Sequence, residues 1–297
     1  MKLIEPKVEL ITEKDPFKKI EIAGRTCYKS EKNITDDSAI KFYSNLVKHQ
    51  HTAMLEHANI VFEVSNAAVY DECCHSKFLH CTQSWNNYTC RRLVSGNIRA
   101  INESENYRIL LALFVYNKAL VYNEEFLNGD LTDVTSSLSA RVVDIDDYND
   151  LTDIEILHHK YLTMRFTCDR GVTHELVRHR LFSFAQESTR YVNYAKQDMQ
   201  FIEPANYEEW TPTQKAFFID ALKYAEHAYN TLVNTQHLTP QQARAVLPNA
   251  IKTEIIVTGN VHEWTHFFNL RYFGTTGKPH PDIKVVAEMA YEKFTNS

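Results

Sequence analysis

The spacing of apolar residues along the chain predicts a mixture of helices and strands. Residues 37–50 (DSAIKFYSNLVKHQ) place apolar side chains at helical spacing, and the β-branched and aromatic run at 60–64 has the character of a strand. Residues 160–168 (KYLTMRFTC) and 252–259 (KTEIIVTG) show the same strand character. The pattern therefore predicts a chain in which strands and helices alternate.

Helix start signals mark the second half of the chain. Thr211 and Thr239 each precede a proline, which places a capping residue before proline at the first helical position. Residues 171–180 (GVTHELVRHR) are predicted to form a helix that Thr173 begins, with Glu175 in its first turn.

A further helix is predicted from Asn260 to about Phe273. Asn260 is a favoured N-cap residue, and Glu263 follows three positions later, as in a capping box. Both signals place the helix directly after the strand predicted at 252–259.

Residues 65–158 are interpreted as an insertion, mainly helical, within a single domain that covers residues 1–297. A helix is predicted around 105–127. The acidic stretch 144–153 (DIDDYNDLTD) lacks the glycine and the terminal glutamate of an EF-hand loop, which favours a solvated loop. No internal repeat appears at solenoid periods.

Composition narrows the function classes. The formal net charge of -6 argues against general nucleic-acid binding. The N-terminal residues carry charges throughout and lack the apolar core of a signal peptide, and the apolar run at 109–116 is too short to span a bilayer. We therefore expect a cytoplasmic protein, or one in the host cytoplasm if its source is viral, with no membrane partner.

The spacing of the cysteines and glycines argues against a metal site and a phosphate-binding loop. The segment 73–81 (CCHSKFLHC) lacks C-x-x-C knuckles, so we predict reduced thiols and no metal site. The seven glycines do not form a phosphate-binding loop. The phosphates of any bound nucleotide must then be held by side chains.

Residues 262–266 (HEWTH) match the H-E-x-x-H motif of zinc peptidases. On a helix His262 and His266 would share a face that binds zinc, with Glu263 as general base. The motif fixes only three positions in a chain with 14 histidines, and Glu263 already has a predicted capping role. A zinc metallopeptidase stays an alternative.

Five arginines stand in apolar surroundings, where each needs an acceptor for its charge. At 100° per residue Arg271 falls in an apolar stripe with Trp264 and Phe267. A buried ion pair or a side chain that reaches water would satisfy it, and so would an anionic substrate. A phosphorylated ligand, with Ser188 donating a hydrogen bond, accounts for the whole set, which is Arg178, Arg180, Arg190, Arg244 and Arg271.

A non-catalytic nucleotide-binding or RNA-binding module would use the same arginines. It would differ from an enzyme in having no turnover.

The spacing of these residues resembles a known family. Arg178-His179-Arg180, seven residues and Ser188 form R-H-R-x7-S, the signature of the flavin-dependent thymidylate synthases. HQHTAMLEH at 49–57 looks like the family's H-x-(S/T)-P-L-E-H segment. ARAVLP and GNVHEWTHFFNLR are similar to its arginine-bearing helix and its C-terminal helix, and RLVSGNIRA at 92–100 is similar to a segment of longer members.

The resemblance implies a fold and a reaction. The fold would be α/β (α+β), with a twisted, mainly antiparallel sheet flanked by helices. A homotetramer would share its active sites between chains. The enzyme would methylate dUMP to dTMP with 5,10-methylenetetrahydrofolate as carbon donor and FAD, reduced by NADPH, as hydride donor, and nucleic acid would not be a partner.

The resemblance also implies roles for particular residues. Arg271 would be catalytic and would activate the uracil ring. The positions that match dUMP contacts are Glu175, Arg178, Gln186, Glu187, Ser188, Arg190, Arg244 and Arg271. The positions that match FAD contacts are Arg178, His179, Arg180, Gln186, Asn260, His262 and His266, and His51 falls where the family places a histidine near flavin and folate.

The chain departs from the family pattern at two places. Ala53 and Met54 replace the usual hydroxyl residue and proline, so the side chain of Ala53 cannot donate a hydrogen bond to flavin. Glu175 and Gln186 occupy positions where relatives carry an amide and an acid, so their polar roles are open to exchange.

Overall fold

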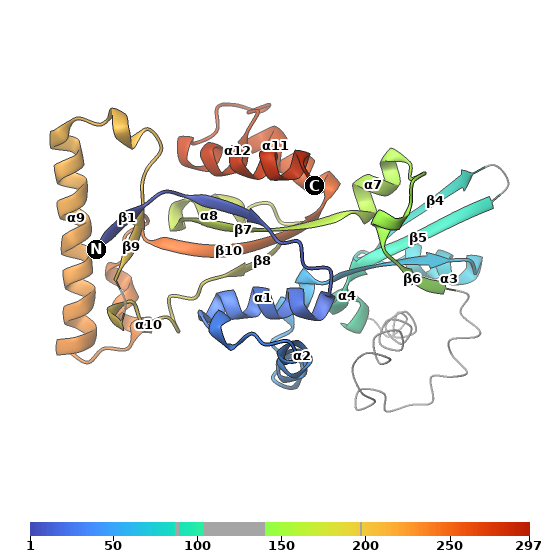
Figure 1. The fold of residues 1–297 in the computed structure, drawn as a ribbon, viewed down its shortest axis with the longest axis horizontal. Helices are drawn as coiled ribbons and strands as arrows, with labels where there is room; N and C mark the ends of the chain where they lie inside the picture. Colours follow the sequence, from blue (N-terminus) through green and yellow to red (C-terminus); the bar gives the residue numbers. More distant parts are fainter. Residues whose placement is uncertain (87–88, 104–139, 197) are drawn as a thin grey trace.

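The molecule contains two antiparallel sheets of four strands, one at its centre and one toward the end that lies away from α9 (Figure 1). The computed structural model describes residues 1–86, 89–103, 140–196 and 198–297. Helix α9 stands at one end of the elongated fold, and strands β4 and β5 extend to the other end. The expected α/β class, with antiparallel strands flanked by helices, is confirmed.

The first sheet has the strand order β2-β7-β10-β8, and every neighbouring pair is antiparallel. Its longest pairing joins β7 to β10, from Tyr161 opposite Asn260 to Asp169 opposite Lys252. The strands predicted at 160–168 and 252–259 are confirmed to within one residue at each end. The strands are β2 (Lys7–Leu10), β7 (Tyr161–Asp169), β8 (Ser183–Gln186) and β10 (Lys252–Asn260).

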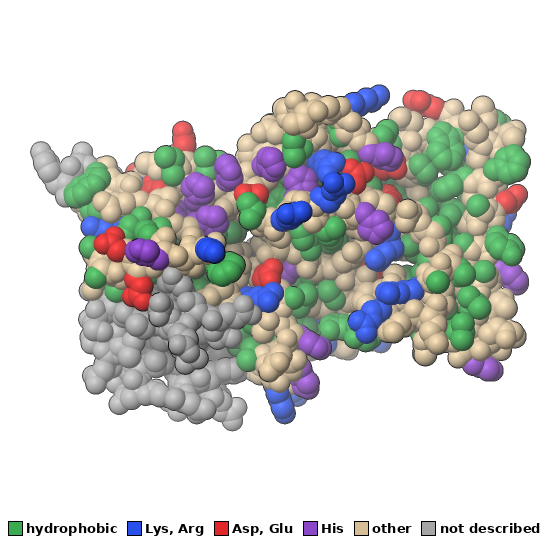
Figure 2. Space-filling view, turned by 180° about the vertical axis from the view of Figure 1, so that it is seen from behind, with side chains coloured by type: hydrophobic (Ala, Val, Ile, Leu, Met, Phe, Trp, Pro, Cys, Tyr) green, Lys and Arg blue, Asp and Glu red, His purple; other side chains and the backbone are tan. Residues whose placement is uncertain are grey.

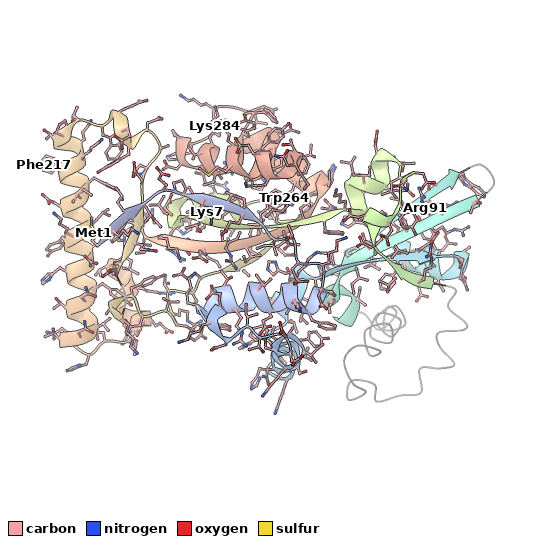
Figure 3. All side chains as sticks on the ribbon, viewed as in Figure 1. Met1, Lys7, Arg91, Phe217, Trp264 and Lys284 are labelled. Atoms are coloured by element: carbon pink, nitrogen blue, oxygen red, sulfur yellow. The ribbon has the colours of Figure 1, made fainter. Side chains whose placement is uncertain are left out.

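Helices cover both faces of this sheet (Figure 1). Helix α1 lies on one face, where Ala23 packs with Ala185 and Ile256. Helices α8, α11 and α12 lie on the other face, where Ile255 and Trp264 belong to one buried cluster. Figure 3 shows Trp264 between α11 and the sheet. The helices are α1 (Pro16–Tyr28), α8 (Arg170–Leu176), α11 (Val261–Arg271) and α12 (Pro281–Thr295).

The second sheet has the strand order β4-β5-β3-β6 and is also antiparallel. The strand predicted at 60–64 is β3, and the helix predicted at 37–50 is α2, which ends at Lys48. The strands are β3 (Asn59–Val64), β4 (His80–Asn86), β5 (Thr89–Asn97) and β6 (Ala140–Val143). The helices beside them are α2 (Ser38–Lys48), α3 (Ala67–Cys74), α4 (Ile98–Glu103) and α7 (Asp153–His159).

A small third layer closes the end of the fold near α9 (Figure 1). Strand β1 (Lys2–Ile4) pairs in parallel with β9 (Gln200–Ile202). Helices α9 (Pro212–Asn230) and α10 (Pro240–Ala243) begin at the predicted Thr-Pro pairs. No helix in the described ranges combines the length and the apolar content that a membrane crossing needs.

The described part of residues 65–158 differs from the mainly helical insertion that we predicted. It supplies β4, β5 and β6 as well as α3, α4 and α7. The strands were missed because polar side chains are buried there by pairing: Arg91 on β5 donates to Glu155 at 2.9 Å and to Asp150 at 2.7 Å. The helix predicted at 105–127 lies outside the described residues.

The acidic stretch 144–153 is mostly exposed, as predicted for a solvated loop, but several of its side chains also make structural contacts. Asp144 accepts a hydrogen bond from Lys14 at 2.8 Å, and Asp150 accepts the one from Arg91. Thr152 and Glu155 form the capping box that begins α7. The closely spaced acidic residues act individually here: some cap a helix, and others pair with basic side chains.

Two buried histidines join the two sheets. His57, which precedes β3, contacts Thr258 of β10 through Nδ1 at 2.9 Å. His159, which precedes β7, contacts Ser95 of β5 through Nδ1 at 2.8 Å. Burial lowers the pKa of His57 to about 4, and burial together with His80 lowers the pKa of His159 to about 3. Both rings are therefore neutral near pH 7.

Lowering the pH from about 7.5 to about 5 is expected to reduce the free energy of unfolding by about 2 kcal/mol for each of these histidines. Each histidine has a lower pKa in the folded protein than the ordinary value of 6.5, so its contribution to stability is fully present at pH values above 6.5. This stability is lost as the pH falls toward the lowered pKa. Urea unfolding at the two pH values measures the difference. His57→Gln should reduce it and the exposed His49→Gln should not; equal free energies at both pH values would contradict the account.

Candidate active site

The R-H-R segment lies in the loop between α8 and β8, not in a helix as we predicted. Asp169 caps α8 by accepting from the backbone N–H of Val172 at 2.8 Å, so the helix begins before Thr173. The Thr173 hydroxyl donates to the carbonyl of Arg170 at 2.9 Å and is not a cap. The helix ends at Leu176, so Glu175 lies in its last turn and not in its first.

Arg271, at the end of α11, meets two residues from α8 and its following loop. Its Nη1 donates to Glu175 at 2.7 Å, and its Nε donates to Nε2 of His179 at 3.1 Å. Arg271 therefore forms an ion pair within the chain, which was one of the alternatives. Its side chain is 21% exposed, and Nη2 makes no hydrogen bond within the described part of the chain.

His179 is neutral in this cluster. Burial, the Arg271 charge and His266 lower its pKa to about 4. Because a guanidinium only donates, Nε2 of His179 must accept, and its proton sits on Nδ1. The ring of His266 lies 5.9 Å away, so Glu175, His179, His266 and Arg271 form one cluster, the Arg271 cluster.

Glu187 belongs to a second, buried group that the sequence did not reveal. It accepts a hydrogen bond from Tyr194 at 2.8 Å and ion-pairs with Lys252 at 3.2 Å. Lys252 and Lys29 also each lie 2.6 Å from Glu254. Burial alone would raise the pKa of Glu254, but the two lysines lower it to about 2. The alternation of Lys252 and Glu254 with the buried Thr253 and Ile255 was the only signal for this network.

Gln186 and Ser188 stand on either side of Glu187. The Gln186 amide donates to the Thr173 hydroxyl at 2.9 Å, which ties β8 to α8. The Ser188 hydroxyl accepts from the backbone N–H of Arg190 at 3.3 Å. Both predicted substrate positions are thus held by local contacts.

The loop after β8 meets the segment that carries Arg244. Arg190 donates to Gln241 of α10 at 3.1 Å, and Arg244 donates to Thr189 at 3.3 Å. Both arginines are exposed. The structure therefore brings Ser188, Arg190 and Arg244 together into a group with two solvent-facing positive charges.

A cavity of about 1020 Å³ opens between the two sheets and takes in two more predicted residues. Arg180 and Asn260 line it from the first-sheet side, and His80 lines it from the second-sheet side. Asn260 lies 3.5 Å from the His80 ring nitrogen. Figure 2 shows basic side chains and histidines across the middle of the face turned away in Figure 1.

The remaining predicted residues do not join these groups. Arg178 is exposed, and its side chain has no partner among the residues that the structure describes. His51 is exposed at the start of the turn before β3, with His49 as its ring neighbour at 6.5 Å. His262 stacks on His158 at 5.6 Å.

The histidines of the HEWTH motif lie on the exposed side of α11. His262 and His266 are exposed, and their ring neighbours are His158 and His179. In the described ranges no group of three or more histidine, cysteine or acidic side chains is arranged to hold a metal ion. Asn260 accepts from the backbone N–H of Glu263 at 3.0 Å, which confirms the predicted N-cap, whereas the Glu263 side chain makes no return contact of a capping box within the described residues.

Burial makes several thiols poor nucleophiles. It raises the pKa of Cys27 and of Cys73 to about 12, and it raises that of Cys168 well above the ordinary value. A thiol reacts through its thiolate, which these three residues do not form near neutral pH.

Known proteins are similar to this chain. A profile of the family described as "Thymidylate synthase complementing protein" matches residues 9–128 and 145–297. A flavin-dependent thymidylate synthase of Corynebacterium efficiens is 35% identical over 156 residues, which are 47% of this chain and 59% of that protein. One of Geobacter sulfurreducens is 37% identical over 117 residues, 39% of this chain and 50% of that protein.

The matched part thus spans between half and three fifths of the length of these relatives. A solved structure of a UMP/dUMP methylase from Streptomyces cacaoi, bound with 5-Br dUMP, aligns over 100% of this chain and 93% of that one. Its sequence identity is 15% and its TM-score is 0.44.

Glu187→Ala is expected to lower the free energy of unfolding by about 3 kcal/mol, because it leaves the buried Tyr194 hydroxyl without its acceptor and leaves Lys252 and Lys29 to share the single carboxylate of Glu254. Chemical denaturation at pH 7 measures the change. The matched control is Glu208→Ala, whose side chain is 87% exposed and pairs with Lys215. The control should cost less than about 1 kcal/mol; an equally small effect at Glu187 would show that the network is not stabilising.

Proposed function

Because the chain belongs to the family of flavin-dependent thymidylate synthases, we propose that it methylates dUMP to dTMP. The observation that carries the proposal is the meeting of Glu175, His179 and Arg271, which come from α8, the loop after it and the end of α11. All three lie within the residues that the family profile matches. We place the reaction in the cytoplasm.

The proposed reaction balances with one carbon donor and one reductant. The methylene carbon of 5,10-methylenetetrahydrofolate leaves the two folate nitrogens, which releases tetrahydrofolate, and becomes bonded to C5 of the uracil ring, from which a proton leaves. Reduced FAD, when bound, supplies the hydride that completes the methyl group, and NADPH supplies the electrons for the next turnover. The chain's residues must hold flat rings in place and polarise the pyrimidine.

We propose that Arg271 polarises the uracil ring. A guanidinium keeps its charge at any physiological pH, and its Nη2 donors are not used within the described residues. The neutral ring of His179 and the carboxylate of Glu175 hold the guanidinium on two sides and leave its third nitrogen for a substrate oxygen. A fixed donor aimed at developing negative charge lowers the barrier without a covalent nucleophile.

The dUMP phosphate is assigned to Ser188, Arg190 and Arg244. Two exposed guanidinium groups and a hydroxyl, which the contacts of Arg190 with Gln241 and of Arg244 with Thr189 hold near one another, suit a phosphate dianion. The other residues that we assign to dUMP, by family resemblance, are Glu175, Arg178, Gln186 and Glu187.

The residues that line the cavity fit FAD. Arg180 offers guanidinium donors to a pyrophosphate, and Asn260 offers an amide. The other residues that we assign to FAD are Arg178, His179, Gln186, His262, His266 and His51. His51 and Arg178 lie apart from the rest, and we propose that a homotetramer with shared sites brings them to FAD.

Turnover tests the proposed function directly. Tritium should leave C5-labelled dUMP, and dTMP should form, when methylenetetrahydrofolate, NADPH and FAD are all present. Leaving out any one of them should stop product formation. A zinc peptidase would instead cleave peptides in the presence of zinc, and a non-catalytic nucleotide-binding module would release no tritium.

Arg271→Ala is expected to lower kcat at least about 100-fold while the protein still binds FAD, because the charge that stabilises the activated ring is gone. The matched control is Arg141→Ala, whose side chain is 69% exposed and pairs with Glu63. The control should keep its kcat. A kcat for Arg271→Ala within about twofold of the unchanged protein would remove the assigned role.

A further inference from the structure

The chain contains the same structural unit twice. The first repeat is residues 57–103, and the second repeat is residues 159–186 together with 252–271. Each is a strand, a helix, a hairpin partner strand, a central strand and a second helix. The sheet orders β4-β5-β3-β6 and β8-β10-β7-β2 correspond strand by strand.

The pairing registers of the two repeats coincide. In the first repeat β3 and β5 begin their pairing with Asn59 opposite Asn97, and in the second β7 and β10 pair Tyr161 with Asn260. Strand β4 places His80 opposite Ser95, and β8 places Ser183 opposite Thr258. A shared register fixes which residues of the two repeats are equivalent.

The equivalence extends to the helix and the loop after it. Asn66 caps α3 and Asp169 caps α8, each by accepting from backbone N–H groups of its helix. The sixth residue after each cap is a glutamate, Glu72 or Glu175. The eleventh is a basic residue, Lys77 or Arg180, and the seventeenth is a glutamine, Gln83 or Gln186.

The corner between the central strand and the second helix is also repeated. Its sequence is Ser-Gly-Asn at 95–97 and Thr-Gly-Asn at 258–260. A side chain at Gly96 would overlap Leu79, and one at Gly259 would overlap Phe182, which is the equivalent residue. Asn97 accepts from the backbone N–H of Ala100 at 2.8 Å, as Asn260 does from that of Glu263 at 3.0 Å.

The two repeats face each other across an approximate two-fold axis. His57 of the first repeat contacts Thr258 of the second, and the equivalent His159 of the second contacts Ser95 of the first. In a two-fold interface each contact occurs twice, with the roles of the two units exchanged. The two histidine contacts have this relation. One chain therefore contains a two-fold packing of repeats that a single-repeat chain could form only with a second subunit.

The cavity of about 1020 Å³ lies between the repeats and is lined by equivalent residues of both. The equivalent pairs in its wall include Lys77 with Arg180, Phe78 with Leu181, and Asn97 with Asn260. Phe78 is 71% exposed and Leu181 is 75% exposed. The side chains of Lys77 and Arg180 have no hydrogen-bond or ion-pair partner in the described part of the chain.

This wall has the chemistry of a dinucleotide site. Two basic side chains without partners suit a pyrophosphate, two amides suit a base or ribose, and two exposed apolar side chains suit a flat ring. The volume is at the upper end of the range of about 300–1,000 Å³ for small-molecule sites, which matches a large ligand. Negative charge is present too, since Glu72 and Glu263 also line the cavity.

We propose that the first repeat supplies one wall of the FAD site, with Lys77 binding the pyrophosphate beside Arg180 and Phe78 packing on a ring of the cofactor. This inference rests on the proposed function. It adds residues of the first repeat to the assigned FAD contacts, and it gives residues 75–80 and 96–100 a role in the reaction. If each chain carried only one repeat, a second subunit would have to supply this wall of the cavity. Here one chain supplies both walls.

The test is the affinity of the full-length protein for FAD and for riboflavin, measured by flavin fluorescence. Lys77→Ala should weaken FAD binding about tenfold, because a charge-assisted hydrogen bond to phosphate is lost, and should leave riboflavin binding unchanged. Phe78→Ala should weaken both ligands. The matched controls are Lys41→Ala and Phe217→Ala, at exposed positions away from the cavity. Figure 3 labels Phe217 on α9, at the far end of the fold.

The outcomes separate this inference from the proposed function. If the unchanged protein forms dTMP and both first-repeat variants bind FAD as it does, the inference is wrong and the function stands. If Lys77→Ala weakens FAD and riboflavin equally, Lys77 does not bind the pyrophosphate. If the unchanged protein binds no FAD, both fail. Thermal melting of each variant confirms that the fold is intact.

Discussion

The arrangement of the molecule depends on two neutral imidazole rings buried between the sheets. His57 and His159 each bridge from the start of a strand in one sheet to a hydroxyl of a central strand in the other. A protonated ring at either position would place an unpaired charge in a buried site, which costs several kcal/mol. These contacts set how the sheets meet, and therefore the shape of the cavity between them.

The three groups of basic residues differ in how their charges are paired. The Arg271 cluster pairs one guanidinium with one carboxylate and one neutral ring, and leaves part of the guanidinium exposed. The Glu187 network pairs two lysines with two carboxylates in a buried place, where it anchors β8 to β10 and α1. Lys77 and Arg180, in contrast, keep their charges unpaired within the described chain. Unpaired cations in the wall of a cavity favour an anionic ligand.

Much of the fold could be predicted from local patterns. Strands β7 and β10 are rich in β-branched and aromatic residues, and α9, α10 and α11 begin at side chains that cap helices in most contexts. The start of α8 was misplaced because Asp169 and Thr173 are both able to cap, and only the tertiary structure decides between them. Strands β4 and β5 were missed because Arg91 and Ser84 are satisfied by Glu155, which lies on a helix far along the chain.

The sequence predicts which arginines belong to the candidate site, but it does not predict how they group. Which of them pair within the chain depends on side-chain packing: Arg271 pairs with Glu175, whereas Arg180 has no hydrogen-bond or ion-pair partner among the described residues. The repeat escaped detection because its copies share few identities and because the second copy is divided by residues 187–251. Register and capping contacts, which a sequence does not display, make the repeat evident.

A crystal structure of the protein with FAD bound would test the central claim most directly, namely that two copies of one unit enclose the cofactor. The account predicts FAD in the cavity between the sheets, with its pyrophosphate in hydrogen-bonding distance of both Lys77 and Arg180. FAD bound with no atom in contact with residues 57–103 would contradict it.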